Sequence, residues 1–133
     1  MIENSQTRRY QILLAEDDET NQDIVKAFLA DTDDLDLTIA SHGRQALEAA
    51  LARKYDLMIL DQQMPLINGD RVLLQLRAGR SVNAETPVIR FTAAADAKPA
   101  EIRRVNGVAE TTLPKPLRKE TLVTTIRTML ALL

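Results

Sequence analysis

The chain of 133 residues contains no cysteine and no tryptophan, and only one histidine. Without cysteine it has neither a disulfide framework nor a thiolate metal site, as is typical of proteins in a reducing compartment. Neither sign of charge dominates, since 17 lysine and arginine residues meet 19 acidic ones for a net charge of −2. That balance does not indicate the basic face by which proteins bind nucleic acids directly.

Long apolar runs are also missing. No stretch approaches the roughly 18–20 apolar residues of a membrane-spanning helix, and the N-terminus lacks the apolar segment of a secretory signal. We therefore expect a cytoplasmic protein without membrane insertion. The hydrophobic content of 45% suffices for one core, so we predict a loose lead over residues 1–9 and a single domain over residues 10–133.

Short apolar runs alternate along the chain with segments that are apolar at helical spacing. Residues 57–60 are continuously apolar, as in a central parallel strand, whereas residues 35–39 alternate as in a half-exposed edge strand. Further strands are predicted at 11–15, 87–91 and 111–113, and helices at 23–30, 43–54, 98–105, 118–132 and in a segment capped by Asp70. Asn106-Gly107 is predicted to end the helix at 98–105. The alternation predicts an α/β fold with a parallel sheet between two helical layers.

Polar side chains follow four of the predicted strands. They are the acidic run Glu16-Asp17-Asp18, then Asp61, Thr92 and Lys115. The carboxyl ends of parallel strands lie along one edge of a sheet, where open α/β sheets bind ligands, so we expect these groups to converge. Carboxylates, a hydroxyl and an ammonium together suit a hard cation and a phosphoryl group.

The carboxylates are candidate Mg²⁺ ligands. Asp17 and Asp61 are the predicted direct ligands, Glu16 is close enough to act through water, and Asp18 points to solvent. The alternative is that the acidic run only caps the first helix. Asp61 favours the metal site, because a carboxylate at the mouth of an apolar strand is costly unless paired, and it is also a candidate nucleophile toward phosphorus. Thr92 taken alone fits a cap or turn residue better than a site residue, and only the neighbouring groups make its hydroxyl a candidate donor to a phosphoryl oxygen.

Four motifs extend this pattern. They are Ile12-Leu13-Leu14-Ala15-Glu16-Asp17-Asp18, Leu60-Asp61-Gln62-Gln63-Met64-Pro65 with Gly69, Phe91-Thr92-Ala93, and Pro114-Lys115-Pro116. Taken together they resemble the receiver domain of two-component response regulators over nearly the whole chain. The resemblance implies a flavodoxin-like, doubly wound sheet of five parallel strands in the order 2-1-3-4-5, with five helices.

The resemblance also implies roles for single residues. Asp61 would take a phosphoryl group from a histidine kinase or a histidine phosphotransfer protein, with the domain catalysing its own phosphorylation and dephosphorylation. Asp17, Asp61 and the backbone carbonyl of Gln63 would bind Mg²⁺, with Glu16 acting through water. Thr92 and Lys115 would contact the phosphoryl oxygens. A downstream protein partner would read the face built from residues 97–105, 111–113 and 118–132.

Some positions depart from the family pattern. Thr112 stands where receivers often carry the aromatic residue that moves together with the threonine. Arg90 replaces an apolar strand residue, and it either reaches a sheet end or pairs with an acid near the last strand. Pro116 is a candidate cis-proline. His42 is predicted to be an exposed loop residue with no part in phosphoryl transfer.

Two other functions compete with that of a phosphoacceptor. A pseudo-receiver would use the same fold as a phosphorylation-independent binding module, which the missing aromatic residue favours and the complete set of acids opposes. A haloacid-dehalogenase-like enzyme would need an aspartate two residues after its nucleophile, where this chain has Gln63. The chain is either a stand-alone regulator or a receiver of a hybrid histidine kinase, and Asn21-Gln22 after the acidic run resembles the hybrid type.

Overall fold

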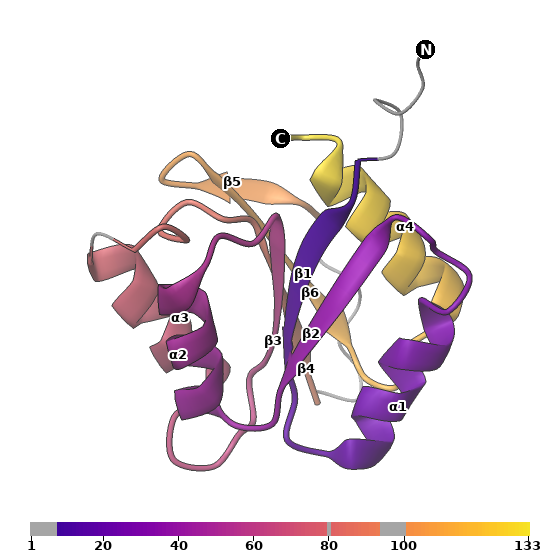
Figure 1. Cartoon of the computed structure of the whole chain (residues 1–133), viewed down its shortest axis with the longest axis horizontal. Coiled ribbons are helices and arrows are strands. Elements are labelled where there is room, and N and C mark those ends of the chain that lie inside the picture. Colours follow the sequence, from indigo (N-terminus) through magenta and orange to yellow (C-terminus); the bar gives the residue numbers. More distant parts are fainter. Residues whose placement is uncertain (1–7, 80, 94–100) are drawn as a thin grey trace.

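A mostly parallel sheet separates two layers of helices in the computed structural model, which describes residues 8–79, 81–93 and 101–133 (Figure 1). The strands are β1 (Tyr10–Ala15), β2 (Leu35–Ala40), β3 (Leu57–Asp61), β4 (Val88–Thr92), β5 (Arg103–Val105) and β6 (Val108–Pro114). The helices are α1 (Glu19–Phe28), α2 (Gly43–Ala52), α3 (Gly69–Ala78) and α4 (Lys119–Leu130). The strand order is β2-β1-β3-β4-β6-β5, and all neighbours pair in parallel except β5 and β6. The predicted order of five parallel strands is therefore confirmed, with β6 as the fifth.

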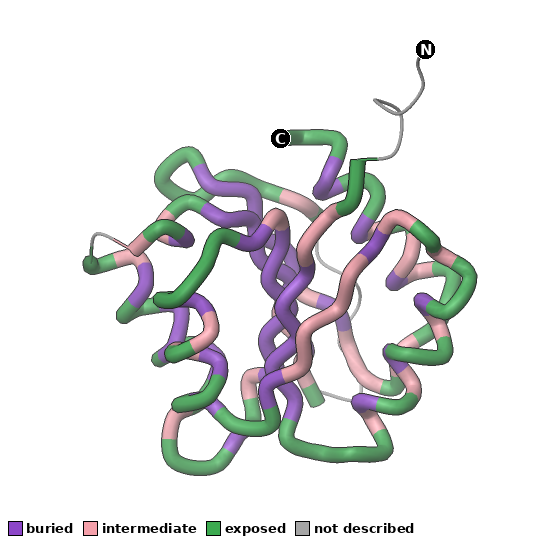
Figure 2. The backbone as a smooth tube through the Cα atoms, viewed as in Figure 1, coloured by how far each residue is buried: buried purple, intermediate pink, exposed green. Residues whose placement is uncertain are grey.

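Each face of the sheet carries its own hydrophobic core. Ile12 and Leu14 of β1 pack with α1 and α4, whereas Leu13 and Ala15 pack with α2 and α3, because side chains alternate along a strand. Burial is concentrated along the central strands (Figure 2), and all of β3 is buried. β2 is the half-exposed edge strand that its alternation predicted.

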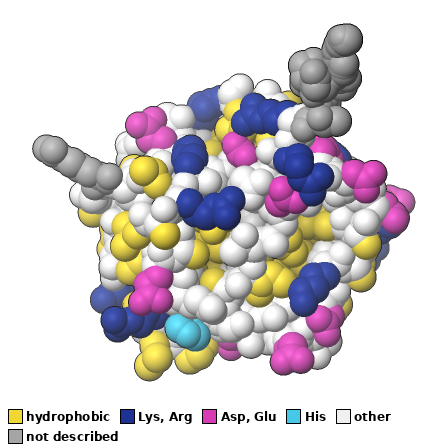
Figure 3. Space-filling model, viewed as in Figure 1, with side chains coloured by type: hydrophobic (Ala, Val, Ile, Leu, Met, Phe, Trp, Pro, Cys, Tyr) yellow, Lys and Arg dark blue, Asp and Glu magenta, His cyan; other side chains and the backbone are white. Residues whose placement is uncertain are grey.

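The surface mixes both signs of charge. On the face shown in Figure 3, lysine and arginine side chains are interspersed with acidic ones, so that face carries no field of a single sign. Among the described residues, no helix is both long enough and apolar enough to cross a membrane.

The start of α3 differs from the prediction. Asn68, not Asp70, is its N-cap, and the Asn68 side chain accepts a hydrogen bond from the Arg71 amide. Asp70 lies in the first turn and pairs with Arg90 of β4 at 2.8 Å. His42 is exposed as predicted, and it caps α2 by accepting from the Gln45 amide through Nδ1.

The helix predicted at 98–105 is wrong for the residues that the structure describes. Residues 98–100 lie outside them, and Arg103–Val105 form β5, an antiparallel partner of β6. Asn106 and Gly107 have φ values of 52° and 83°, so they form the turn of a β-hairpin rather than the end of a helix. Two consecutive positive φ values are the mark of the type I′ hairpin turn, for which Asn-Gly is the preferred sequence.

The face of β4 and β6 that lies on the α3 side carries a polar strip. Ile89 and Phe91 of β4 face α1 and α4, so Arg90 faces the α3 side, as do Glu110 and Thr112 of β6. Arg90 pairs with Glu110 at 2.8 Å, and Glu110 also pairs with Arg77 of α3. A groove of about 640 Å³ runs along this strip.

These ion pairs decide between the two interpretations of Arg90. Its guanidinium bonds Asp70 in the first turn of α3 and Glu110 of β6, both at 2.8 Å. Pairing with an acid near the last strand is therefore the correct one. The pairs also tie α3 to two strands at once.

The hairpin turn predicts that adding a side chain at Gly107 destabilises the protein. Gly107→Ala is expected to lower the free energy of unfolding by about 1–2 kcal/mol, since an L-residue is strained at φ 83°. Gly79→Ala is the matched control, because Gly79 has a φ of −100° and its added Cβ would meet only an ordinary contact at 3.5 Å. Urea unfolding of both variants measures the difference, and equal stabilities would argue against the hairpin turn.

Candidate functional site

The predicted site residues all lie at the carboxyl ends of parallel strands. Glu16 and Asp17 follow β1, Asp61 is the last residue of β3, Thr92 is the last residue of β4, and Lys115 follows β6. Since β1, β3, β4 and β6 are adjacent in the sheet, the fold brings the four strand ends together along one edge.

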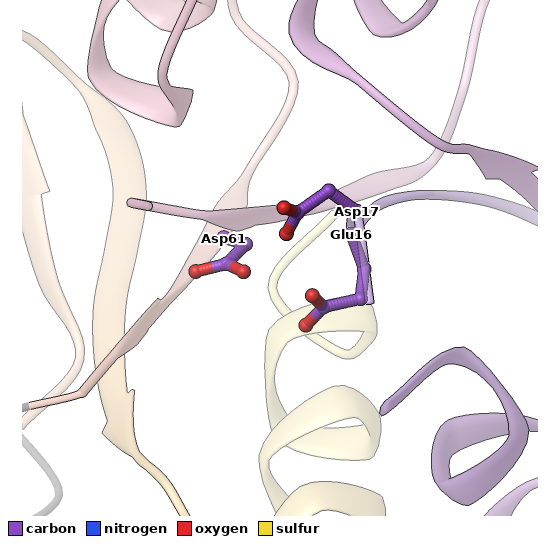
Figure 4. A group of neighbouring side chains, drawn as sticks. All are labelled: Glu16, Asp17 and Asp61. Atoms are coloured by element: carbon purple, nitrogen blue, oxygen red, sulfur yellow. The ribbon is translucent and has the colours of Figure 1, made fainter. Parts of the chain in front are cut away.

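Three carboxylates form a compact cluster at this edge. Ligand oxygens of Glu16, Asp17 and Asp61 all lie within 4.8 Å of one another. Figure 4 shows the carboxylates of Glu16 and Asp17 pointing toward the side on which Asp61 lies. Glu16 and Asp61 are buried, with 0% and 2% of their surface exposed, whereas Asp17 is open to solvent. The cluster is thus buried at Glu16 and Asp61 and open to solvent at Asp17.

Lys115 supplies positive charge to the cluster. Its Nζ donates a hydrogen bond to Asp61 Oδ2 at 2.9 Å and lies 3.2 Å from Glu16 Oε1. Burial works against the charged form of Lys115, but the two carboxylates outweigh it and raise its pKa. The lysine therefore stays protonated and offsets part of the repulsion among the acids.

The charged form of Glu16 is disfavoured in this cluster. Burial, together with the neighbouring Asp61, raises the pKa of its carboxyl to about 7, although the Asp18 amide and Lys115 act to lower it. Its Oε1 contacts Lys115 as an ion pair but accepts no hydrogen bond from the described residues. This buried oxygen therefore has an ionic partner but no hydrogen-bond donor among the described residues.

Asp61 is held in place through its own loop. Its Oδ1 accepts a hydrogen bond from the Gln63 amide at 3.0 Å, and the Gln62 amide donates to the Phe91 carbonyl of β4 at 3.1 Å. Gly69 at the start of α3 packs directly against this segment, since a Cβ there would lie 2.5 Å from the Asp61 carbonyl oxygen. A side chain at Gly69 would push α3 away from Asp61.

Thr92 and Lys115 are joined through the backbone. The Lys115 amide donates to the Thr92 carbonyl at 2.8 Å, so the ends of β4 and β6 are held together beside Asp61. Asp61 pairs in register with Phe91, the residue before Thr92. The Lys115-Pro116 peptide bond is cis, which decides a point that the sequence left open.

The interpretation of the acidic run as a helix cap applies to one residue of it. Asp18 is the N-cap of α1 and accepts hydrogen bonds from the amides of Thr20 and Asn21. Sequence reasoning missed the function of Gln22, whose buried side-chain amide bonds the Glu16 carbonyl at 2.7 Å. The available signal was a polar residue on the buried stripe of α1, three positions before Val25.

Comparison with protein families agrees with this geometry. The family model described as "Response regulator receiver domain" matches residues 12–127. The transcriptional regulatory protein CpxR of Klebsiella pneumoniae is 38% identical over 122 residues, which are 90% of this chain and 48% of CpxR. The response regulator ArlR of Staphylococcus saprophyticus is 33% identical over 119 residues, covering 90% of this chain and 51% of ArlR. The chain spans about half the length of these curated relatives.

Solved structures share the fold. The receiver domain of the Francisella response regulator 1452 has a TM-score of 0.75 at 25% identity, covering 92% of this chain and 98% of that one. The receiver domain of the sensor histidine kinase PA1611 from Pseudomonas aeruginosa has a TM-score of 0.76 at 24% identity, with coverages of 92% and 98%. That structure contains a magnesium ion coordinated in its active-site cleft.

The chain therefore belongs to the family of response-regulator receiver domains, the phosphoacceptor modules of two-component signalling. Its fold is the flavodoxin-like α/β fold of CheY-like receivers. It differs from the predicted version in having β5 where a fourth helix was expected, with four helices among the described residues.

The buried Glu16 predicts an unusual dependence of stability on pH. In the unfolded chain its carboxyl ionises near 4.5, but in the fold it stays protonated until about pH 7. Between these values the folded state binds the extra proton, so its contribution to stability falls as pH rises. With EDTA present to remove metal ions, the free energy of unfolding of wild type should fall by about 1–3 kcal/mol relative to that of Glu16→Gln as the pH rises from 5 to 8. Urea unfolding across this range measures it, and parallel curves for the two proteins would contradict the prediction.

Proposed function

We propose that Asp61 accepts a phosphoryl group from a phosphohistidine of a histidine kinase or a histidine phosphotransfer protein, in a reaction that requires Mg²⁺. The observation that carries the proposal is the Lys115 ammonium, 2.9 Å from the buried Asp61 carboxylate inside a cluster of three acids. A structural ion pair needs one acid and one base. Two further carboxylates beside the pair are explained by a cation and a phosphoryl group that share the site.

The phosphoryl transfer needs little chemistry from the protein. An oxygen of Asp61 attacks phosphorus, the bond between phosphorus and the imidazole nitrogen breaks, and the imidazole leaves with the electron pair and takes up a proton. The product is an acyl phosphate on Asp61, which water later hydrolyses at the same site. Positioning and charge stabilisation account for the acceleration, as in other phosphoryl transfers. Lys115 neutralises charge on the phosphoryl oxygens, and the Thr92 hydroxyl donates to them.

The donor set fits Mg²⁺. The metal prefers oxygen ligands and is usually held by one or two carboxylates together with waters and phosphate oxygens. Asp17, Asp61 and the backbone carbonyl of Gln63 would bind it directly, and Glu16 would bind it through water. The Glu16 Oε1, which is short of a donor, supports this assignment. When bound, Mg²⁺ neutralises the acids and the incoming phosphoryl charge.

Phosphorylation adds about −1.5 to −2 of charge at Asp61, and we propose that Thr92 and Lys115 reorganise around it. Their backbones are bonded to each other, so the ends of β4 and β6 would move together. The face that a downstream partner reads would consist of β6 and α4, as expected from the sequence, with the β5 hairpin in place of the predicted helix. This shifts an existing equilibrium between two surface states.

One observation favours a second candidate, a phosphorylation-independent binding module. Thr112 replaces the aromatic residue of the family and lines the groove beside Arg90, whose ion pairs fasten β4 and β6 to α3. A surface fixed in this way would bind a partner without switching. Mg²⁺ titration separates the two candidates, because the binding module needs no metal.

The direct test is intact-protein mass spectrometry after incubation with acetyl phosphate, with and without Mg²⁺. Wild type should gain the mass of one phosphoryl group only when Mg²⁺ is present, and Asp61→Asn should abolish the gain because it removes the nucleophile. Asp23→Asn is the matched control, since Asp23 is an exposed aspartate on α1. Labelling of Asp61→Asn at the wild-type level would overturn the assignment of the phosphoacceptor.

A further inference from the structure

We infer that Gln22 of α1 is a positioning residue for the metal site, which it serves by fixing the peptide plane between Glu16 and Asp17. Its buried side-chain amide donates to the Glu16 carbonyl oxygen at 2.7 Å and lies 3.3 Å from Ser41 Oγ. This inference rests on the proposed function, because it assigns Gln22 a part in binding the cation.

The loop that carries the acids is tethered at three successive peptide planes. The Glu16 amide donates to the Ala40 carbonyl at 3.0 Å, which fixes the plane before Glu16. Gln22 fixes the plane between Glu16 and Asp17. The Asp18 amide donates to Glu16 Oε2 at 3.1 Å, which fixes the plane after Asp17. Since a peptide unit is planar, holding one of its atoms sets the direction in which the next side chain leaves the backbone.

The middle tether has the largest effect on Asp17. The carbonyl bonded by Gln22 belongs to the same planar unit as the Asp17 amide, so rotation of that unit swings the Asp17 carboxylate. The Asp17 side chain is exposed, whereas the Asp61 carboxylate is held by the Gln63 amide and by Lys115. The position of Asp17 therefore depends on its backbone, which Gln22 and the Asp18 amide hold on either side.

The tether from Gln22 uses no carboxylate oxygen of the cluster. The tether at Asp18 occupies Glu16 Oε2, but Gln22 bonds only a backbone oxygen and the Ser41 hydroxyl. It can hold the loop in one geometry before and after the cation binds. A site organised in advance loses less affinity to ordering, and removing an outer contact that orients a ligand typically weakens metal binding about 10–100-fold.

Gln45 provides a close control. Its Oε1 accepts from the Ser41 amide at 2.6 Å, so it is a second glutamine that contacts the same serine, but it bonds the Ser41 backbone rather than the acidic loop. Gln22→Met and Gln45→Met remove the same amide group and keep a similar side-chain length. Both positions lie in helices, α1 and α2, where methionine is well tolerated.

The experiment is isothermal titration of MgCl₂ into wild type, Gln22→Met and Gln45→Met, at a temperature where circular dichroism shows all three to be folded. We expect the Mg²⁺ dissociation constant of Gln22→Met to rise about tenfold and that of Gln45→Met to stay at the wild-type value. Amide ¹⁵N relaxation should show increased motion of Asp17 and Asp18 in Gln22→Met alone. A residue that only stabilised the fold would lower the melting temperature and leave the dissociation constant unchanged.

Each possible result of these measurements either supports or overturns the role assigned to Gln22. Equal Mg²⁺ affinity of wild type and Gln22→Met overturns the inference and leaves the proposed function intact. Equal weakening in both variants overturns it as well, since the cause would then be the Ser41 loop. Absence of Mg²⁺ binding by wild type overturns the metal site itself. If Gln22→Met does not fold, ¹⁵N relaxation of the wild-type Asp17 amide provides the test. An amide that is already rigid before Mg²⁺ is added supports the inference. An amide that becomes rigid only after Mg²⁺ is added contradicts it.

Discussion

Repulsion among three carboxylates is the constraint on which the rest of this structure depends. Glu16, Asp17 and Asp61 would not remain within 4.8 Å of one another without positive charge and backbone support. Lys115 supplies part of the charge, and it reaches the cluster because β6 lies next to β4. The parallel order of the strands is thus what makes the site possible. A change that moves the end of β6 relative to β3 would separate the lysine from the acids.

The two faces of the sheet are covered by different kinds of contact. On one face, α1 and α4 cover a continuous apolar core. On the other, α2 and α3 cover the first part of the sheet, and the strip over β4 and β6 is polar. The ion pairs from Asp70 through Arg90 and Glu110 to Arg77 take the place of apolar contacts there and fasten α3 along its length. Since Gly69 beside Asp70 packs on the Asp61 backbone, the same contacts steady Asp61, the proposed phosphoacceptor.

The elements that could be predicted from the sequence are those specified by a short stretch of residues. Continuous apolar runs marked β1 and β3, and the polar residues after the strands marked the site, because the position of a residue at a strand end follows directly from the run before it. The hairpin was missed for the opposite reason. Asn106-Gly107 ends a helix or turns a hairpin equally well, and the choice depends on pairing between β5 and β6. Gln22 and the Asn68 cap likewise depend on backbone positions that no periodicity reveals.

The central claim is that four strand ends form one site for a divalent cation and a phosphoryl group. A crystal structure with Mg²⁺ and beryllium fluoride, a tetrahedral mimic of the phosphoryl group, tests it most directly. The account predicts the fluoride complex on Asp61, in contact with Thr92 and Lys115, and the metal on Asp17, Asp61 and the Gln63 carbonyl. A metal bound away from Asp17 and Asp61, or a beryllium fluoride complex away from Asp61, would contradict it.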